Sequence, residues 1–232
     1  MTDNDGSFLR QQIEYYRARA TEYDEWFLRI GRYDRGEDHR KKWFAELEQV
    51  REALSSALRG GDVLELACGT GLWTPHLLPG SNRVVAVDAT PEVIDICRNR
   101  VTDNRVEFIE SDIFTWKPTE RFDLIFFGFW LSHVPMSCFD GFWDGLRDAI
   151  KPDGTVFFVD SLLTQDSTAV NHDKLDRSGR STRKLNDGRE FEIVKIFHEP
   201  SVLEKQLLEM GWRGEVRTTG EFFYYGVFKL ES

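Results

Sequence analysis

The sequence predicts an α/β fold in which a mostly parallel sheet is flanked by helices. Short, continuous apolar runs alternate with stretches of helical periodicity, a pattern typical of parallel strands that helices bury on both faces. One such run, residues 62–67, leads into Gly69-Thr70-Gly71, where glycines allow a tight turn and a close approach to a ligand. The 232 residues, 41% hydrophobic and 30% charged, suit one α/β domain with a well-buried core.

Residues 1–60 are predicted to form an N-terminal helical lid. From Ser7 onward, apolar residues recur at alternating spacings of four and three, which places them on one helical face. Thr21 and Asp24 have the spacing of a capping box, so we expect two shorter helices with a break near Ala20. A second helical face ends before Gly60-Gly61 and consists of Trp43, Leu47, Val50 and Leu54.

The remaining chain, residues 61–232, is predicted to form the α/β domain itself. After the strand at 62–67, the predicted strands are 83–87, 106–109, 122–127 and 155–160. The predicted helices between them are 71–78, 91–100 and 139–150. Thr90 is expected to cap the helix that Pro91 begins, and Pro152-Asp153-Gly154 is expected to form a turn.

Beyond residue 160 the alternation of strands and helices breaks, which predicts an insertion at about 161–198. The insertion is polar, has a turn signal at Asn186-Asp187-Gly188, and contains one predicted strand at 191–197. A helix at about 200–210 and a closing hairpin around Gly220 are expected to complete the domain.

The residues directly after each strand are the candidates for a binding site, because ligands of open α/β sheets lie at the carboxyl ends of the strands. Glu65 stands inside the first strand, where a buried carboxylate is costly unless it meets donors or a cation. A dinucleotide fingerprint requires a small third residue, and the chain has Thr74 at that position. A nicotinamide oxidoreductase is therefore the weakest of the alternatives.

The run from Glu65 to Gly71 resembles motif I of the class I S-adenosylmethionine-dependent methyltransferases, although Ala67 stands where that family often has glycine. The resemblance extends over residues 62–160, through acidic ends of the second and third strands and an aromatic end of the fourth. It implies a Rossmann-like, seven-stranded fold, S-adenosylmethionine as methyl donor with S-adenosylhomocysteine as product, and no metal. The cofactor-binding residues that it implies are Glu65, Ala67, Gly69, Thr70, Gly71, Asp88, Ala89, Ser111, Asp112, Ile113 and Phe129.

By the same resemblance, Glu65 and the two glycines hold the methionine half of the cofactor. Asp88 would bind the ribose, and Asp112 with Ile113 the adenine. From the residues alone, Asp88 is equally well explained as a helix cap or a solvated strand end, and the alternative for Asp112 is a cap.

His133 is the candidate catalytic residue, because it lies just past the fourth strand, where the resemblance places the transferred methyl group. A neutral imidazole could take the proton from a hydroxyl or amine acceptor. The alternative, that His133 only shapes the loop, stays open because methyl transfer from a sulfonium depends largely on positioning.

Aromatic residues are the candidates for the acceptor side of the site. Tyr15, Tyr16 and Trp130, together with His133, are the predicted substrate-binding residues, and Tyr23 with Trp26 would extend an aromatic lid. The helical stripe through Tyr16 and Tyr23 favours core packing for these two, which makes Tyr15 the better pocket candidate. Further candidates are Arg183, Arg189 and Tyr224.

Composition narrows the class of partner and the location. A net charge of -10 argues against nucleic acid, whose phosphates require clustered Lys and Arg. Three widely spaced cysteines are typical of a reducing compartment, and the chain has no long apolar run, so we expect a cytoplasmic protein with no membrane partner.

The predicted function is methyl transfer to an oxygen or nitrogen atom of a small molecule, and two alternatives stay open. One is a noncatalytic S-adenosylmethionine-binding protein. The other is an RNA or protein methyltransferase, although Gly128-Phe129-Trp130-Leu131 stands where nucleobase amine methylation would use Asn/Asp-Pro-Pro-Tyr. The acceptor's identity and the oligomeric state are not encoded in any motif of the chain.

Overall fold

A seven-stranded sheet with the order β3-β2-β1-β4-β5-β9-β8 forms the centre of the molecule, in a computed structural model that describes residues 3–169 and 179–231. Five strands are parallel, namely β1 (Asp62–Leu66), β2 (Arg83–Asp88), β3 (Val106–Glu110), β4 (Phe122–Gly128) and β5 (Ile150–Ser161). Two antiparallel strands complete one edge, β9 (Phe223–Leu230) beside β5 and β8 (Trp212–Thr218) outside it. The predicted fold class is therefore confirmed.

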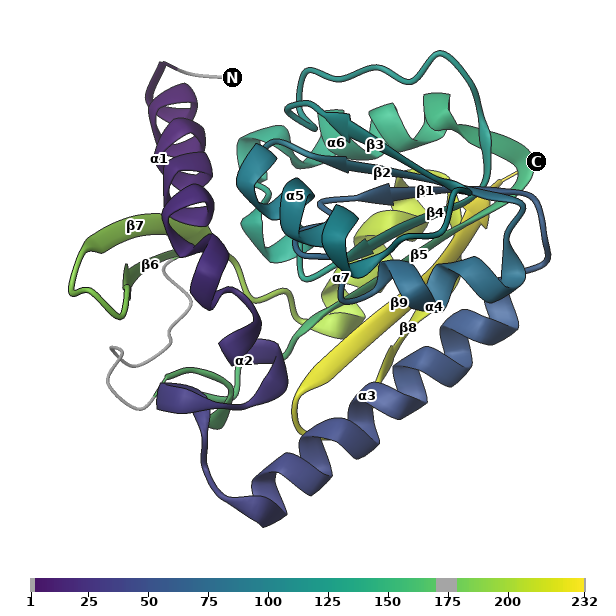
Figure 1. The fold of residues 1–232 in the computed structure, drawn as a ribbon. Helices are drawn as coiled ribbons and strands as arrows, with labels where there is room; N and C mark the ends of the chain where they lie inside the picture. Colours follow the sequence, from purple (N-terminus) through teal and green to yellow (C-terminus); the bar gives the residue numbers. More distant parts are fainter. Residues whose placement is uncertain (1–2, 170–178, 232) are drawn as a thin grey trace.

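Helices cover both faces of this sheet (Figure 1). On one face lie α3 (Glu37–Ala57), α4 (Thr74–Leu77) with the turn η3 (Leu78–Gly80), and α5 (Pro91–Arg100). On the other face lie α6 (Met136–Ala149) and α7 (Pro200–Glu209). Because successive strand residues point to opposite faces, Val63 packs in the core beneath α3 while Leu64 packs in the core beneath α6.

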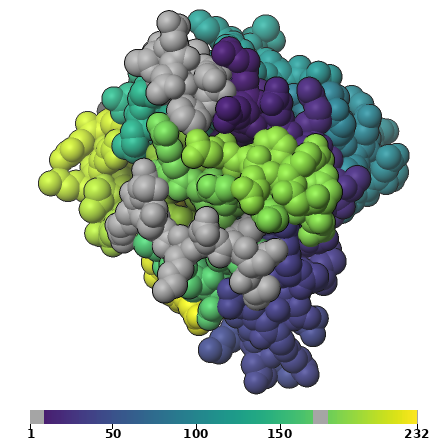
Figure 2. All heavy atoms as spheres, turned by 90° about the vertical axis from the view of Figure 1, so that its left-hand side faces the viewer, coloured from purple at the N-terminus to yellow at the C-terminus, as the bar shows by residue number. Residues whose placement is uncertain are grey.

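The lid and the insertion lie together at the side of the sheet where the parallel strands end (Figure 1). The break expected near Ala20 is present, since α1 (Asp3–Arg19) is followed by η1 (Ala20–Glu22), α2 (Asp24–Leu28) and η2 (Gly31–Tyr33). The insertion forms a separate hairpin of β6 (Gly179–Lys184) and β7 (Glu190–Lys195), which packs against α1. Figure 2, which views this side, shows the hairpin lying across the end of α1.

The structure differs from the sequence prediction in several local details. Residues 152–154 are a bulged part of β5 rather than a separate turn, since the pairing with β4 shifts register between Phe122 and Leu124. The side chain of Thr90 makes no cap hydrogen bond, and the Thr90 backbone amide donates to Asp88. Strand β6 was not predicted, because its Arg, Ser, Thr and Lys residues lack an apolar run. Residues 170–178 of the insertion lie outside the described residues.

Helix α3 packs against the sheet, which affects where the boundary between the lid and the main domain is drawn. Its residues Trp43, Leu47, Val50 and Leu54 are fully buried against the sheet. We therefore propose that the lid comprises residues up to about Gly36, and that α3 belongs to the main domain. Within the described part of the chain, none of the helices combines the length and apolar character that crossing a membrane requires.

Candidate functional site

Two adjoining cavities open at the carboxyl ends of the parallel strands. The first, which we call the β2–β3 cavity, lies between α1 and the loops that follow β2 and β3. The second, which we call the hairpin cavity, lies between the lid, the end of β1 and the β6–β7 hairpin. Residues that line both cavities mark the place where they meet, and they are Tyr16, Tyr23, Ala67, Gly128, Phe129 and His133.

Asp88 is held rigidly at the rim of the β2–β3 cavity. Its Oδ2 accepts a hydrogen bond from the Gly69 amide at 2.9 Å, and its Oδ1 accepts from the Thr90 amide at 3.0 Å. Burial raises the pKa of this carboxyl to about 6, although the backbone hydrogen bonds act in the opposite direction. Asp88 thus joins the ends of β1 and β2 and still borders the cavity.

Asp112 lines the same cavity at the end of β3. Its Oδ1 accepts from the Phe114 amide at 3.0 Å, which closes a short turn around Ile113. This turn places Ile113 and Phe114 against the cavity as apolar walls. Asp112 therefore lines the cavity and closes a turn, and it caps no helix in the described part of the chain, since β4 is the next regular element after β3.

The turn after β1 adopts the backbone conformations that glycine takes without strain. Gly69 and Gly71 have φ values of 55° and 80°, and Ala67, the residue expected to be glycine by resemblance, has a φ of 54°. A Cβ at Gly71 would overlap the Cys97 sulfur of α5, and a Cβ at Gly69 would lie 3.0 Å from the Tyr23 hydroxyl. The turn is therefore packed closely between α5 and the lid.

Glu65 is a buried carboxyl group at the base of the hairpin cavity, with 1% of its surface exposed. Thr74 hydrogen-bonds the carboxyl group, whereas no donor among the described residues reaches Oε2. Burial raises the pKa of Glu65 well above its ordinary value. Since burying a carboxylate without a partner is costly, this group suits a ligand that brings a positive charge.

His133 and Tyr16 form a hydrogen-bonded pair at the junction of the cavities. His133 lies in η4 (Leu131–His133), just after β4, and its Nδ1 is 2.7 Å from the carbonyl oxygen of Val194. Because a carbonyl only accepts, Nδ1 carries the proton, and Nε2 accepts from the Tyr16 hydroxyl at 2.9 Å. Burial, and after it the Lys195 ammonium, holds the pKa of His133 well below its ordinary value.

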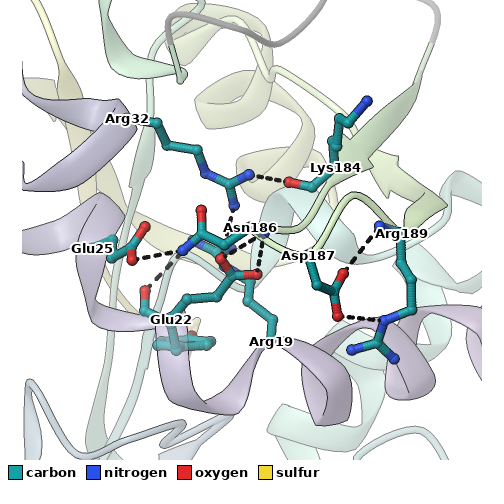
Figure 3. A network of polar contacts seen from close by, with 9 residues as sticks. Arg19, Glu22, Glu25, Arg32, Lys184, Asn186, Asp187 and Arg189 are labelled. Atoms are coloured by element: carbon teal, nitrogen blue, oxygen red, sulfur yellow. Dashed lines mark hydrogen bonds and ion pairs between the residues drawn. The ribbon is translucent and has the colours of Figure 1, made fainter.

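Polar contacts join the lid to the hairpin across more than 150 residues of sequence (Figure 3). Glu22 accepts from the backbone amide of Asn186 at 3.0 Å and pairs with Arg32. The side-chain amide of Asn186 donates to Glu25 at 2.8 Å, and Arg32 also donates to the Lys184 carbonyl. The lid and the hairpin are thus one continuous cover over the hairpin cavity.

A second set of contacts fastens this cover to the glycine turn. Asp24 accepts from the Thr70 hydroxyl at 2.5 Å and forms an ion pair with Arg100 of α5. Arg100 in turn donates to the Thr70 carbonyl at 2.8 Å. The lid is therefore hydrogen-bonded directly to the glycine turn after β1.

The structure brings most of the predicted cofactor residues to the cavities. The ones that line a cavity are Glu65, Ala67, Thr70, Asp88, Ala89, Asp112, Ile113 and Phe129. Gly69, Gly71 and Ser111 are not among the lining residues described, and they contribute backbone geometry instead. The Ser111 amide, for example, donates to the Asp88 carbonyl at 2.9 Å.

The two neighbouring tyrosines of α1 have exchanged their expected places. Tyr16 lines both cavities, whereas Tyr15, among the residues described, is absent from both linings and is fully buried beside Leu185 and Ile193. Its ring lies 5.7 Å from that of Phe191. The hairpin occupies the Tyr15 side of α1, and this packing partner was not evident from the helical stripe.

The remaining acceptor-side candidates are divided. Trp130 lines the β2–β3 cavity, and Tyr23, Trp26 and Arg183 line the hairpin cavity. Arg189 instead pairs with Asp187 at the surface, and Tyr224 is fully buried in the core. Arg19 and Lys195 also line the hairpin cavity. The sequence analysis did not name them as candidates, because no sequence feature distinguishes them among the 30 Lys and Arg residues of the chain.

No metal site is evident in the described ranges 3–169 and 179–231, which contain no cluster of three or more His, Cys, Asp or Glu residues placed to hold an ion. The residues of the β2–β3 cavity and the unpartnered oxygen of Glu65 instead fit a polar organic ligand with a cationic group.

Residues 63–154 match a family model described as a methyltransferase domain. The chain is 30% identical to a malonyl-[acyl-carrier protein] O-methyltransferase of Acetivibrio thermocellus, over 58% of this chain and 50% of the relative. It is 27% identical to nodulation protein S of Bradyrhizobium diazoefficiens, over 54% of this chain and 56% of the relative. The chain thus spans about half the length of the curated relatives it matches.

Solved structures extend the similarity to nearly the whole chain. The complex of DhpI with SAH superposes with a TM-score of 0.80 at 35% identity and covers 97% of both chains. The N-methyltransferase NodS of Bradyrhizobium japonicum WM9, in complex with S-adenosyl-L-homocysteine, has a TM-score of 0.64 at 18% identity, over 94% of this chain and 98% of that one. The second likeness concerns the fold alone.

Proposed function

Since the chain belongs to the class I S-adenosylmethionine-dependent methyltransferases, we propose that it transfers a methyl group to an oxygen or nitrogen atom of a small-molecule acceptor. The observation that supports this proposal most directly is the pair of cavities that meet at Tyr16, Phe129 and His133. The β2–β3 cavity suits the nucleoside half of a donor, and the hairpin cavity suits its methionine half at Glu65 with an acceptor beside it, so the reacting groups would face each other near the shared residues.

The residues present fit the methyl donor. Asp88 would accept from ribose hydroxyls, and the turn at Asp112 with Ile113 would border the adenine, as their position in the lining of the β2–β3 cavity supports. Glu65, whose Oε2 has no hydrogen-bond partner among the described residues, would receive a positive charge of the methionine half. S-adenosylmethionine, when bound, supplies a methyl group on a sulfonium, which is already a good leaving group.

We propose that His133 positions Tyr16 rather than acting as the general base. Its Nδ1 proton is committed to Val194, its Nε2 is occupied by the Tyr16 hydroxyl, and its lowered pKa disfavours taking up another proton. Tyr16, which lines both cavities, thus has its hydroxyl fixed by His133 at the junction of the cavities.

Replacing Tyr16 by phenylalanine is expected to lower kcat for methyl transfer roughly 10-fold, because one orienting hydrogen bond is lost. Affinity for S-adenosylhomocysteine should stay within about 2-fold of the original, since the ring remains in place. Steady-state kinetics and calorimetry together test this expectation. A variant with unchanged kcat would show that the Tyr16 hydroxyl does not contribute to the reaction.

The proposed function is tested by incubating the full chain with methyl-labelled S-adenosylmethionine and a cell extract. The expected result is label in a small molecule, suppressed by added S-adenosylhomocysteine. Binding of S-adenosylmethionine without any transfer would favour the noncatalytic alternative. Label that accumulates in RNA or protein would favour a macromolecular acceptor.

A further inference from the structure

The hairpin cavity carries a charge opposite to that of the protein as a whole. The chain has a formal net charge of -10. Nevertheless, among the described residues that line this cavity, Arg19 of α1, Arg183 of β6 and Lys195 of β7 are cationic, and only Glu65 is a carboxylate. The cations come from the lid and the hairpin, whereas Glu65 lies at the strand end.

Arg19 is a weakly compensated cation of this cavity. Its Nε is buried without a hydrogen-bond partner, and its Nη2 makes one long contact, 3.5 Å, to the Tyr23 carbonyl. The guanidinium lies against the rings of Tyr15 and Tyr23, 5.7 and 5.3 Å from their centroids. Aromatic faces stabilise a cation but do not neutralise it.

Lys195 is only partly balanced. Its ammonium donates to the Ser132 hydroxyl at 2.8 Å and lies 3.6 Å from the buried carboxylate of Asp160. Asp160 also accepts from the backbone amides of Ser132 and Ser161. Asp160 therefore offsets part of the charge of Lys195, whereas Arg19 makes no ion pair of this kind among the described residues.

The titration behaviour of the neighbouring groups agrees with this charge distribution. Burial lowers the pKa of Lys195, and the nearby Arg183 and Arg19 lower it further, against the opposing effect of Asp160. The same two arginines and Lys195 also disfavour a charge on His133. Grouped, partly buried cations are costly for a protein to maintain unless a ligand brings a compensating negative charge.

On the basis of the proposed function, we propose that the hairpin cavity binds a small acceptor whose oxyanion, a carboxylate, phosphate or phosphonate, receives the methyl group. Arg19 and Lys195 would hold its charged oxygens, with Arg183 on the hairpin side. An ammonium acceptor would be repelled by Arg19, Arg183 and Lys195, so the charges of these side chains favour an anionic oxygen over a cationic amine.

The reaction balances without a proton acceptor. A lone pair of the anionic oxygen forms the new C–O bond to the methyl carbon, the C–S bond of the donor breaks, and its electron pair remains on sulfur. One positive and one negative charge disappear, and the products are a methyl ester and a neutral thioether. Because the nucleophile is already deprotonated, the reaction requires no general base. This agrees with His133, whose two ring nitrogens are both hydrogen-bonded.

The test measures anion binding separately from catalysis. The full chain is saturated with S-adenosylhomocysteine, and ethylphosphonate, ethyl phosphate, propionate, neutral propanol and propylammonium are titrated by calorimetry. We expect at least one anion to bind and the alcohol and the ammonium to bind at least about 10-fold more weakly. Which anion binds best distinguishes a carboxylate site from a phosphate or phosphonate site.

Arg19→Met, which keeps the length and apolar stem of the side chain, is expected to weaken anion binding at least about 10-fold. Affinity for S-adenosylhomocysteine should be retained. In turnover assays with labelled donor and the preferred anion, the loss should fall on KM rather than kcat, because Arg19 binds the ground state and the transition state alike. The matched control is Arg17→Met on the same helix, whose exposed side chain pairs with Glu92.

The inference is overturned if S-adenosylhomocysteine binds but propanol or propylammonium binds as well as every anion, or if Arg19→Met and Arg17→Met behave alike. Failure of S-adenosylhomocysteine itself to bind would instead overturn the proposed function.

Discussion

Replacing Asp88 by alanine is expected to weaken the binding of both S-adenosylmethionine and S-adenosylhomocysteine about 100-fold. The substitution removes the proposed acceptor for the ribose hydroxyls. It also removes the oxygens that hold the Gly69 and Thr90 amides, and so loosens the connection between β1 and β2. Isothermal calorimetry with both ligands measures the effect, and unchanged affinity would exclude Asp88 from the ribose site.

Two further variants separate the causes of that loss. Asp88→Asn retains the shape and one acceptor oxygen, so its affinity should lie between those of the original protein and the alanine variant. Asp95→Ala, which removes an exposed carboxylate of α5 paired with Arg98, is the matched control and should bind normally.

The pH dependence of binding gives an independent check on Asp88. Its pKa, raised to about 6, means that the carboxylate is charged above that pH and protonated below it. Affinity in the original protein should therefore fall as the pH drops through about 6, whereas Asp88→Asn lacks this component. The difference between the two profiles isolates Asp88 from other titrating groups such as Glu65.

Replacing Gly71 by alanine is expected to lower the free energy of unfolding by roughly 2 to 6 kcal/mol. A φ of 80° strains any residue with a Cβ, which costs about 1 to 3 kcal/mol. The added methyl group would also overlap the Cys97 sulfur, and overpacking of this kind costs about 1 to 3 kcal/mol more. Urea denaturation monitored by tryptophan fluorescence measures the change.

Gly188 offers a control for the conformational part of this cost. It has a φ of 90°, and a Cβ there would meet nothing within 4 Å among the described residues. Gly188→Ala should therefore be destabilised only by the backbone strain. If Gly71→Ala is no less stable than Gly188→Ala, the contact with Cys97 is not a source of destabilisation. Adding Cys97→Ala to Gly71→Ala should restore only the part of the stability that is lost through the overlap with the Cys97 sulfur.

The donor side of the site was predictable because its chemistry is local in sequence. Each of its residues lies at or within a few positions of a strand end, and the carboxyl ends of parallel strands meet at one edge of the sheet. Glu65, Asp88 and Asp112 could therefore be placed together from the order of the strands. Their hydrogen bonds, however, could not, since Asp88 and Asp112 each satisfy backbone amides as well as bordering the cavity.

The sequence by itself thus determined the fold class, the break in the lid and the strand ends that border the β2–β3 cavity. Only the tertiary structure decided which tyrosine of α1 faces the cavities and which basic residues gather around the hairpin cavity. Tyr16 and Arg19 obtain their surroundings from a hairpin more than 150 residues away, and a helix pattern does not say what will pack against each face. An arginine at a cavity wall and one at the surface have the same local sequence signature, because their difference lies entirely in long-range packing.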